Sequence, residues 1–197
     1  MPRPKKSNQD EMAVTRIEKA FWQLLETEDY SNITVLRISQ ESGTNRNSFY
    51  YHYRNIDDLA HKAFMRNANN DVSKALIAAL MSHSCNGNEQ SAPIIAPAVL
   101  QHSKRIMLCA RSNSPYLNHL VHDLLQKIWF DAMSIKEELL SAEEKVQVRF
   151  VFAGLVAVLG SQEIKDCPLL MSSLSQTEIG KAFIAALERI ALGQQSP

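Results

Sequence analysis

The chain has 197 residues, of which 45% are apolar and 21% charged, and its 21 Lys and Arg residues balance its 21 Asp and Glu residues. This composition is typical of a soluble globular protein, and it excludes intrinsic disorder, collagen and coiled-coil fibre as the main class. A net charge of zero also argues against a protein that coats nucleic acid or a membrane through bulk positive charge. Any nucleic-acid binding must therefore be local.

The cysteines and the apolar segments indicate the compartment. Cys85, Cys109 and Cys167 are odd in number and far apart, which favours free thiols over a disulfide framework. The longest apolar run, residues 150–159, is too short for a membrane span of about 18 to 20 residues. The N-terminus lacks the apolar stretch of a signal peptide. We therefore expect a cytoplasmic protein without a membrane partner.

The first half of the chain reads as short helices. Between residues 12 and 25, apolar side chains recur at steps of three and four, which predicts a helix with one buried face. Thr34 can cap a short second helix, and Gly43 suits the left-handed conformation that ends it. Asn45 can cap a third helix over about 46–53. This pattern predicts a helix-turn-helix, whose second helix enters the major groove of DNA.

The remaining start signals are also helical. Asn55 with Asp58 predicts a long fourth helix of about 25 residues, and residues 86–93 read as a loop. One later helix is predicted from Pro97 to about Arg111, and another starts at Ser114–Pro115. Two more are predicted from Ser141 with Glu144 to about Ile164, and from Ser175 with Glu178 to about Leu192. Residues 146–159 could form a strand, but their length and cap favour helix.

We therefore predict an all-α fold in which an N-terminal three-helix helix-turn-helix domain is followed by a larger helical bundle for ligand binding and dimerisation. The predicted parts are a flexible basic arm over 1–11, a DNA-binding domain over 12–66, and a regulatory and dimerisation domain over 67–197.

The third helix carries the candidate DNA-binding face. Phe49 and Tyr53 point toward the core, whereas the opposite side carries no Lys, Asp or Glu. Arg46 suits guanine or phosphate, Asn47 suits adenine, and tyrosine hydroxyls suit phosphates. The candidates on this helix are Arg46, Asn47, Ser48, Tyr50, Tyr51 and His52.

These residues resemble the N-terminal domain of TetR-type transcriptional regulators. The resemblance covers about 12–66 and rests on Ile33-Thr34-Val35, Ile38-Ser39, Gly43-Thr44-Asn45, Phe49-Tyr50-Tyr51-His52-Tyr53 and Asn55 to Leu59. It implies a homodimeric, usually repressing, DNA-binding protein with a variable C-terminal ligand domain. By position, Thr34 and Arg37 would touch phosphates, Tyr50 would hold the DNA backbone, and Arg46, Asn47, Tyr51 and His52 would face the groove.

The sequence departs from the family pattern in the turn and at the fourth helix. Thr44 stands where the family commonly has Val, Ser39 and Ser42 stand where Ala is usual, and Ile56 replaces a frequent Lys that meets phosphate. Losing that lysine removes one contact that releases counterions. The basic arm, with Arg3, Lys5 and Lys6, could replace it or could be only a solubilising tail.

The C-terminal half offers candidates for an effector site and a dimer interface. A small apolar or amphipathic effector would be bound by His102, Met107, Gln126, Trp129, Met133 and Phe152, although such residues are usually core. Residues 150–159 are apolar all round, which predicts a second subunit on one side, or else the enclosed central helix of a monomer. The interface candidates are Phe150, Val151, Leu155, Val158, Leu159, Phe183, Leu187 and Ile190.

Metal and catalytic chemistry are not expected. His119, His122 and Asp123 lie close together, but without an HExxH pattern or a cysteine pair an ordinary polar helix face is favoured over a metal site. The chain has no GxSxG, GxGxxG or P-loop motif, so we expect no cofactor and no enzyme. The predicted function is repression through a near-palindromic duplex DNA operator bound by a homodimer. The alternatives are a helical protein-interaction adaptor without DNA binding and, least favoured, a helical enzyme.

Overall fold

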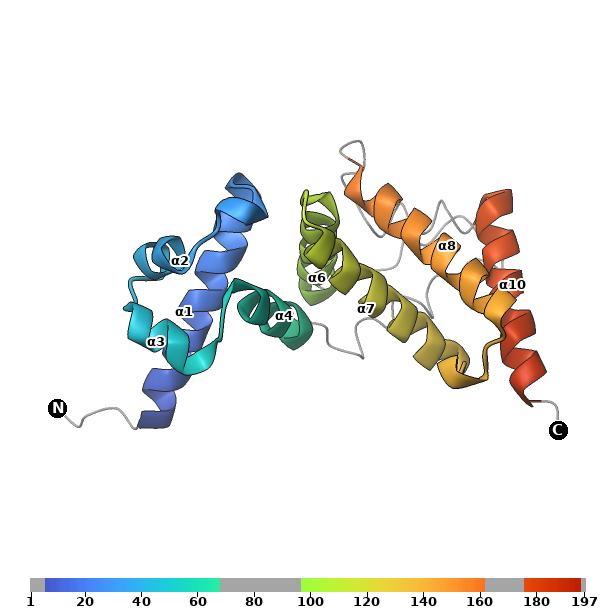
Figure 1. Ribbon diagram of the computed structural model, residues 1–197, viewed down its shortest axis with the longest axis horizontal. Coiled ribbons are helices and arrows are strands. Elements are labelled where there is room, and N and C mark those ends of the chain that lie inside the picture. The colour runs from blue at the N-terminus through green and yellow to red at the C-terminus, as the bar shows by residue number, and fades with distance from the viewer. Residues whose placement is uncertain (1–5, 68–96, 162–175, 196–197) are drawn as a thin grey trace. The chain divides into compact units, whose positions relative to one another are not determined.

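The computed structural model describes residues 6–67, 97–161 and 176–195 (Figure 1). All regular structure in these ranges is α-helix or short 3-10 helix, so the predicted all-α fold class is confirmed. The chain forms two compact units. Unit 1 comprises residues 1–67 together with 112–117, and unit 2 comprises residues 68–111 and 118–197.

Unit 1 is built from four α-helices around one apolar core. These are α1 (Lys6–Thr27), α2 (Val35–Ser42), α3 (Arg46–His52) and α4 (Ile56–Asn67), with the 3-10 helix η1 (Tyr30–Asn32) after α1. Each helix contributes fully buried side chains, among them Phe21, Ile38, Phe49 and Leu59. Removing this apolar surface from water is the main force that holds the short helices together, since isolated helices of this length are marginal.

The turn between α2 and α3 follows the capping signals of the sequence. The Thr34 hydroxyl accepts a hydrogen bond from the Arg37 N–H at 3.3 Å, and the Asn45 side chain accepts one from the Ser48 N–H at 2.7 Å. Gly43 has φ 63, which is the left-handed conformation expected at the end of α2. The predicted starts of both helices are confirmed.

The start of α1 differs from the prediction, and the predicted end of α4 cannot be compared with it. The first helix begins at Lys6, so residues 6–11 are helical where a flexible arm is predicted. Apolar periodicity cannot detect this extension, because it is held by backbone hydrogen bonds and needs no regular apolar stripe. At α4 the predicted cap is present, since Asn55 accepts from the Asp58 N–H at 2.8 Å. The predicted course of this helix beyond residue 67 lies outside the described residues.

Unit 2 contains α6 (Pro97–Arg111), most of α7 (Pro115–Met133), the 3-10 helix η2 (Glu137–Leu139), α8 (Ala142–Gly160) and α10 (Glu178–Gln195). Helix α6 packs closely against α8. An aromatic cluster links three of these helices, because Phe183 of α10 lies 5.4 Å from Trp129 of α7 and 5.6 Å from Phe152 of α8 between ring centroids. Residues 146–159 are therefore helical, as predicted.

The start signals of α7 and α8 are also confirmed. The Ser114 hydroxyl accepts from the Leu117 N–H at 3.4 Å, and Ser141 with Glu144 forms a full capping box. The N-terminus of α10 differs from the prediction. It begins at Glu178, where the Thr177 hydroxyl accepts from the Gly180 N–H at 3.0 Å.

Two other predicted helix ends lie outside the described residues. The first is Ser175, the predicted cap of the last helix. The second is the predicted end of α8 over residues 162–164; the described part of this helix ends at Gly160. Among the helices that are described, none has the length and apolar character needed to cross a bilayer.

Candidate nucleic-acid interface

Helix α3 is fixed to unit 1 by two aromatic side chains on its inner face. Phe49 is fully buried, and Tyr53, at its C-terminal end, is 2% exposed. The Tyr53 hydroxyl donates to the carboxylate of Glu18 on α1 at 3.0 Å, and Arg66 of α4 pairs with the same oxygen at 3.1 Å. Burial raises the pKa of Tyr53 above its usual range, so the hydroxyl remains a donor. This network holds α1, α3 and α4 in one arrangement.

The outer face of α3 is open to solvent. The side chains of Tyr50 and Tyr51 are 58% and 69% exposed, and Arg46 and Asn47 are also exposed. Ser48 and His52 are half-buried. The helix contains no acidic residue, so nothing on it repels phosphate. The structure thus brings the candidate residues of α3 together on or beside one accessible face.

The turn residues that depart from the family pattern contact one another. The Ser42 and Thr44 hydroxyls lie 2.7 Å apart and form a hydrogen bond across Gly43. Ser39 is buried beneath the same turn. Valine at 44 could not make the hydroxyl bond, so the departures act as a pair that connects α2 with the segment leading into α3.

Lys62 of α4 binds the C-terminal end of α3. Its ammonium group donates to the backbone oxygen of His52 at 3.0 Å and to the carboxylate of Asp58 at 2.9 Å. It also lies 5.5 Å from the centre of the Tyr53 ring. A cation at this end of a helix is favourable because the last carbonyls carry partial negative charge. Lys62 therefore stabilises the position of α3 and is not an open phosphate contact.

The candidates outside α3 are less open for DNA contact. Thr34 is exposed, but its hydroxyl already caps α2. The Arg37 guanidinium forms an ion pair with Glu28, and this hydrogen bond raises the pKa of Arg37. Arg3 and Lys5 lie outside the described residues, and Lys6 is the first residue of α1.

Tyr116 is a member of unit 1 that the sequence did not reveal. Its hydroxyl donates to the backbone oxygen of Asp57 at 3.1 Å, and its ring stacks on Tyr30 with 6.4 Å between centroids. The Tyr30 hydroxyl in turn donates to the Asp57 carboxylate. The first residues of α7 therefore belong to unit 1. The only local signal was the helix start at Ser114, which says nothing about a partner 59 residues away in the chain.

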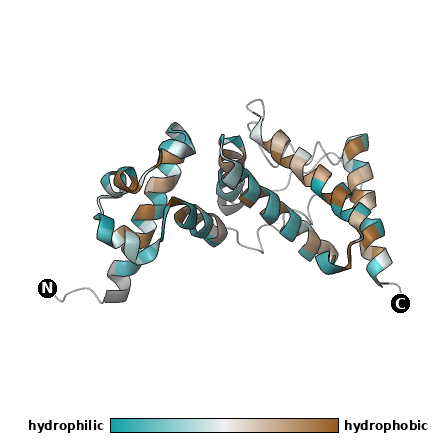
Figure 2. Ribbon diagram, viewed as in Figure 1, coloured by the Kyte–Doolittle hydropathy of each residue, from teal (hydrophilic) through white to brown (hydrophobic). Residues whose placement is uncertain are grey.

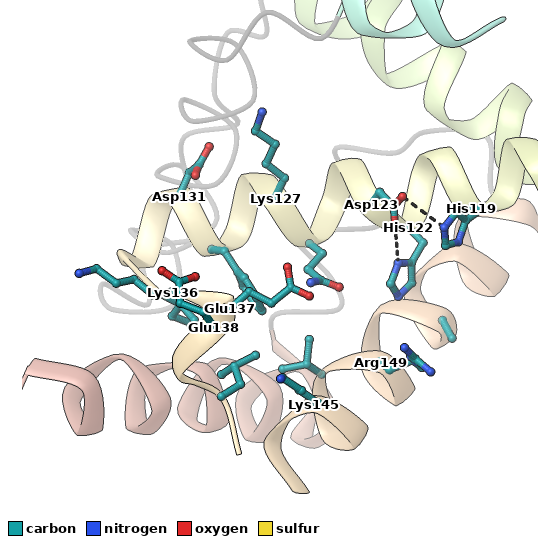
Figure 3. Close-up of a pocket in the computed structure, with 16 residues that line it drawn as sticks. His119, His122, Asp123, Lys127, Asp131, Lys136, Glu137, Glu138, Lys145 and Arg149 are labelled. Carbon is teal, nitrogen blue, oxygen red and sulfur yellow. Dashed lines mark hydrogen bonds and ion pairs between the residues drawn. The ribbon is translucent and has the colours of Figure 1, made fainter. Parts of the chain in front are cut away.

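Unit 2 contains a pocket of about 1000 Å³ formed by α7, η2 and α8 (Figure 3). Of the six predicted effector-binding residues, Gln126 lines it. Eight of the other lining residues are charged: Lys127, Lys136, Lys145, Arg149, Asp123, Asp131, Glu137 and Glu138. The rest of the lining includes apolar side chains such as Phe130, Ile135 and Leu140, so the described pocket is mixed in character.

The other predicted effector residues do not line this pocket. Trp129 and Phe152 belong to the aromatic cluster with Phe183, and Met107 is buried while Met133 is half-buried. His102 is 7% exposed, and within the described part of the chain neither ring nitrogen has a hydrogen-bond partner. Burial lowers the pKa of His102 to about 4. Trp129 and Phe152 pack in this cluster, as large aromatic side chains commonly do in a core, and their binding of an effector stays a prediction.

The predicted dimer residues divide into buried and exposed sets. Leu159, Leu187 and Ile190 are buried within the single chain, so as placed here they contribute to the interior of unit 2. Phe150 is 79% exposed, and Val151, Leu155, Val158 and Phe183 are half-buried. The sequence missed other exposed apolar residues on α8 and α10, namely Val146, Ile179 and Leu192. Figure 2 shows the apolar colouring along both helices.

The fold and the exposed face of α3 define a helix-turn-helix, the arrangement whose second helix enters the major groove in DNA-binding proteins. Residues 17–63 match the sequence model of the family described as "Bacterial regulatory proteins, tetR family". This part of unit 1 is therefore similar to the DNA-binding domain of that family. The predicted resemblance to this family is confirmed for these residues.

Two known proteins are similar over longer stretches. The "Uncharacterized HTH-type transcriptional regulator YxbF" of Bacillus subtilis (strain 168) is 27% identical over 154 residues, which cover 73% of this chain. The match spans only 37% of the length of that relative. The crystal structure of the TetR family repressor AlkX from Dietzia sp. strain DQ12-45-1b matches with 16% identity and a TM-score of 0.41, covering 90% of this chain and 96% of that one.

Proposed function

We propose that the protein represses transcription by binding a near-palindromic operator as a homodimer in the cytoplasm, with one α3 of each subunit in the major groove. The single observation that carries this proposal is the outer face of α3, where Tyr50 and Tyr51 are exposed on a helix anchored by Phe49 and Tyr53. This seven-residue helix exposes two tyrosines and contains no acidic residue. Exposed tyrosine rings leave apolar surface in water, whereas against DNA their hydroxyls can bind phosphates.

The residue types on this face divide the work between phosphates and bases. Arg46 and Asn47, at the N-terminal end of α3, can make paired hydrogen bonds to guanine and adenine edges. The hydroxyls of Tyr50 and Tyr51 can donate to phosphate oxygens, which sets the register of the helix without reading sequence. Base discrimination therefore depends mainly on the first turn of α3.

A palindromic operator requires a two-fold dimer. The exposed apolar side chains of α8 and α10, among them Val146, Phe150 and Ile179, supply the kind of surface that a second copy of the chain would cover. Such a dimer would place its two α3 helices about 34 Å apart, or at a related spacing that matches successive major grooves.

Effector control would act through unit 2. The pocket of about 1000 Å³ is large enough for a small molecule, and its charged lining favours an amphipathic one. An effector changes operator binding only if it prefers one of two conformations, because equal affinity for both shifts nothing. No catalytic step belongs to this function.

The test is selection of bound sites from random duplex DNA with the full chain. We expect an enriched near-palindrome, and we expect Arg46→Ala to relax the preference at one base pair per half-site, at a cost of about 1–3 kcal/mol. Tyr50→Phe should weaken binding to all sequences alike. Lys104→Ala, which removes an exposed cation of α6, is the control and should leave selection unchanged. Absence of any enriched motif contradicts the proposal.

A further inference from the structure

Helix α7 carries a cluster of side chains on the rim of the charged pocket. His119, His122 and Asp123 occupy one side of the helix, and all three line the pocket (Figure 3). His119 Nε2 lies 3.4 Å from one oxygen of Asp123, and His122 Nδ1 lies 3.2 Å from the other. One ligand atom from each of the three residues can be chosen so that all lie within 4.8 Å of one another. The sequence spacing alone could not show this convergence.

Two of these separations are close to those between neighbouring ligands of one metal ion. Two ligand atoms at about 2.0–2.2 Å from a tetrahedral zinc ion are about 3.3–3.6 Å apart. The two histidine–carboxylate distances are 3.4 and 3.2 Å. The imidazole rings of the two histidines are parallel to within 4°, with centroids 6.1 Å apart. His119 is largely exposed, so its ring can turn toward a shared ion.

The state of His122 distinguishes the cluster from an ordinary polar face. This side chain is only 17% exposed, yet Asp123 engages just one of its two ring nitrogens. The other, Nε2, is buried and has no hydrogen-bond partner within the described part of the chain. Buried polar atoms are normally paired. Because no hydrogen bond at Nε2 holds the ring, His122 can present Nδ1, the nitrogen beside Asp123, to a shared ion.

We propose that His119, His122 and Asp123 bind a divalent transition-metal ion of the zinc, nickel or cobalt type. Two imidazoles and one carboxylate suit these ions, whereas magnesium and calcium prefer oxygen ligands. Three protein ligands leave a position for water, and that position is at the rim of the pocket that also holds Lys145 and Arg149. This inference concerns unit 2 alone and stands independently of operator binding.

The first test is titration of the full, metal-free chain with Zn²⁺, followed by calorimetry. We expect one ion per chain at this site. His119→Gln and Asp123→Asn should each weaken it at least about tenfold, since loss of even an outer partner of a metal ligand costs about 10–100-fold. Both side chains are mostly exposed, so neither change should unfold the protein, which circular dichroism checks. His61→Gln, at an exposed histidine of α4, is the matched control and should bind Zn²⁺ as the parent does.

The second test uses Co²⁺ to identify the ligands. Nitrogen and oxygen ligands give ligand-field bands, which Zn²⁺ should abolish by displacement and which His119→Gln should remove. A thiolate charge-transfer band would instead place the ion on a cysteine and overturn the proposal. Failure to bind Zn²⁺, or equal binding by the parent and both site variants, would overturn it as well.

Discussion

Arg37 presents a choice between two partners. In the structure its guanidinium is paired with Glu28, whereas its position in the family pattern places it against a DNA phosphate. A surface ion pair contributes only about 0–1 kcal/mol to folding, so the pair can open at little cost when a phosphate competes. Glu28 therefore acts as a competitor for the cation that DNA would use.

Substituting Glu28→Gln should tighten operator binding. The freed guanidinium gains a phosphate contact, so the dependence of log K on log salt should steepen by about 0.9. Fluorescence anisotropy over a range of salt concentrations measures both quantities. Glu26→Gln removes the same charge from an exposed site on α1 and serves as the control. If the two variants show the same slope, Arg37 does not reach phosphate.

His102 makes the stability of unit 2 dependent on pH. Burial holds its pKa near 4 in the fold, against about 6.5 in an unfolded chain, so the folded protein keeps this ring neutral. Above pH 6.5 the ring is neutral in both states and imposes no penalty. As the pH falls from 6.5 toward 4, the unfolded chain takes up the proton first, and stability declines.

We expect the parent to lose about 2 kcal/mol from this residue between pH 7.5 and pH 5, measured by denaturant unfolding. His102→Gln has no titrating ring, so its stability should fall by correspondingly less over the same interval. His61→Gln removes an exposed histidine and should retain the full pH dependence of the parent. A parallel decline in the parent and His102→Gln would show that His102 protonates in the folded state.

At the scale of elements, the sequence predicted helix starts better than contacts between helices. The caps at Thr34, Asn45 and Ser141 are satisfied within three residues along the chain, so local chemistry fixes them. The contact of Tyr116 with Asp57 has no such local cause, because it joins residues far apart in sequence. The same holds for the site, where the exposure of α3 followed from its periodicity but the ion pair of Arg37 did not.

Two glycines of α8 show how such contacts control stability. A Cβ atom on Gly160 would lie 2.6 Å from the backbone oxygen of Ala110, where α8 meets α6, whereas one on Gly154 would meet nothing within 4 Å. Gly160→Ala should therefore destabilise the protein by about 1–3 kcal/mol through overpacking. Gly154→Ala should stabilise it by about 0.5–1 kcal/mol, because alanine loses less entropy in a helix.

Urea unfolding of the two variants against the parent measures the difference. Because both substitutions add the same methyl group to the same helix, changes in helix propensity act in the same direction in each. Opposite signs of the two effects are therefore required. If both variants gain stability, the close approach of α6 and α8 is not part of the native packing.

At the scale of the whole molecule, the two units set different requirements. Unit 1 presents one α3, which under the proposed function would read only half of a palindrome, so specific binding would depend on a second copy held at a fixed spacing. Unit 2 has apolar side chains on α8 and α10 that remain exposed among the described residues. A second copy of the chain packed on these side chains would remove their apolar surface from water and would also supply the second α3.

Phe150→Glu tests this coupling, because Phe150 is 79% exposed and its replacement leaves the interior of the subunit unchanged. A carboxylate without a partner in a dimer interface costs about 2–5 kcal/mol, so the dimer should dissociate at least about 30-fold more readily in sedimentation experiments. Binding to a full palindrome should fall with it, while binding to an isolated half-site should not. Met12→Glu, at an exposed methionine of α1, adds the same charge outside unit 2 and should stay dimeric. If Phe150→Glu remains a dimer with parental affinity, the subunits associate through another surface.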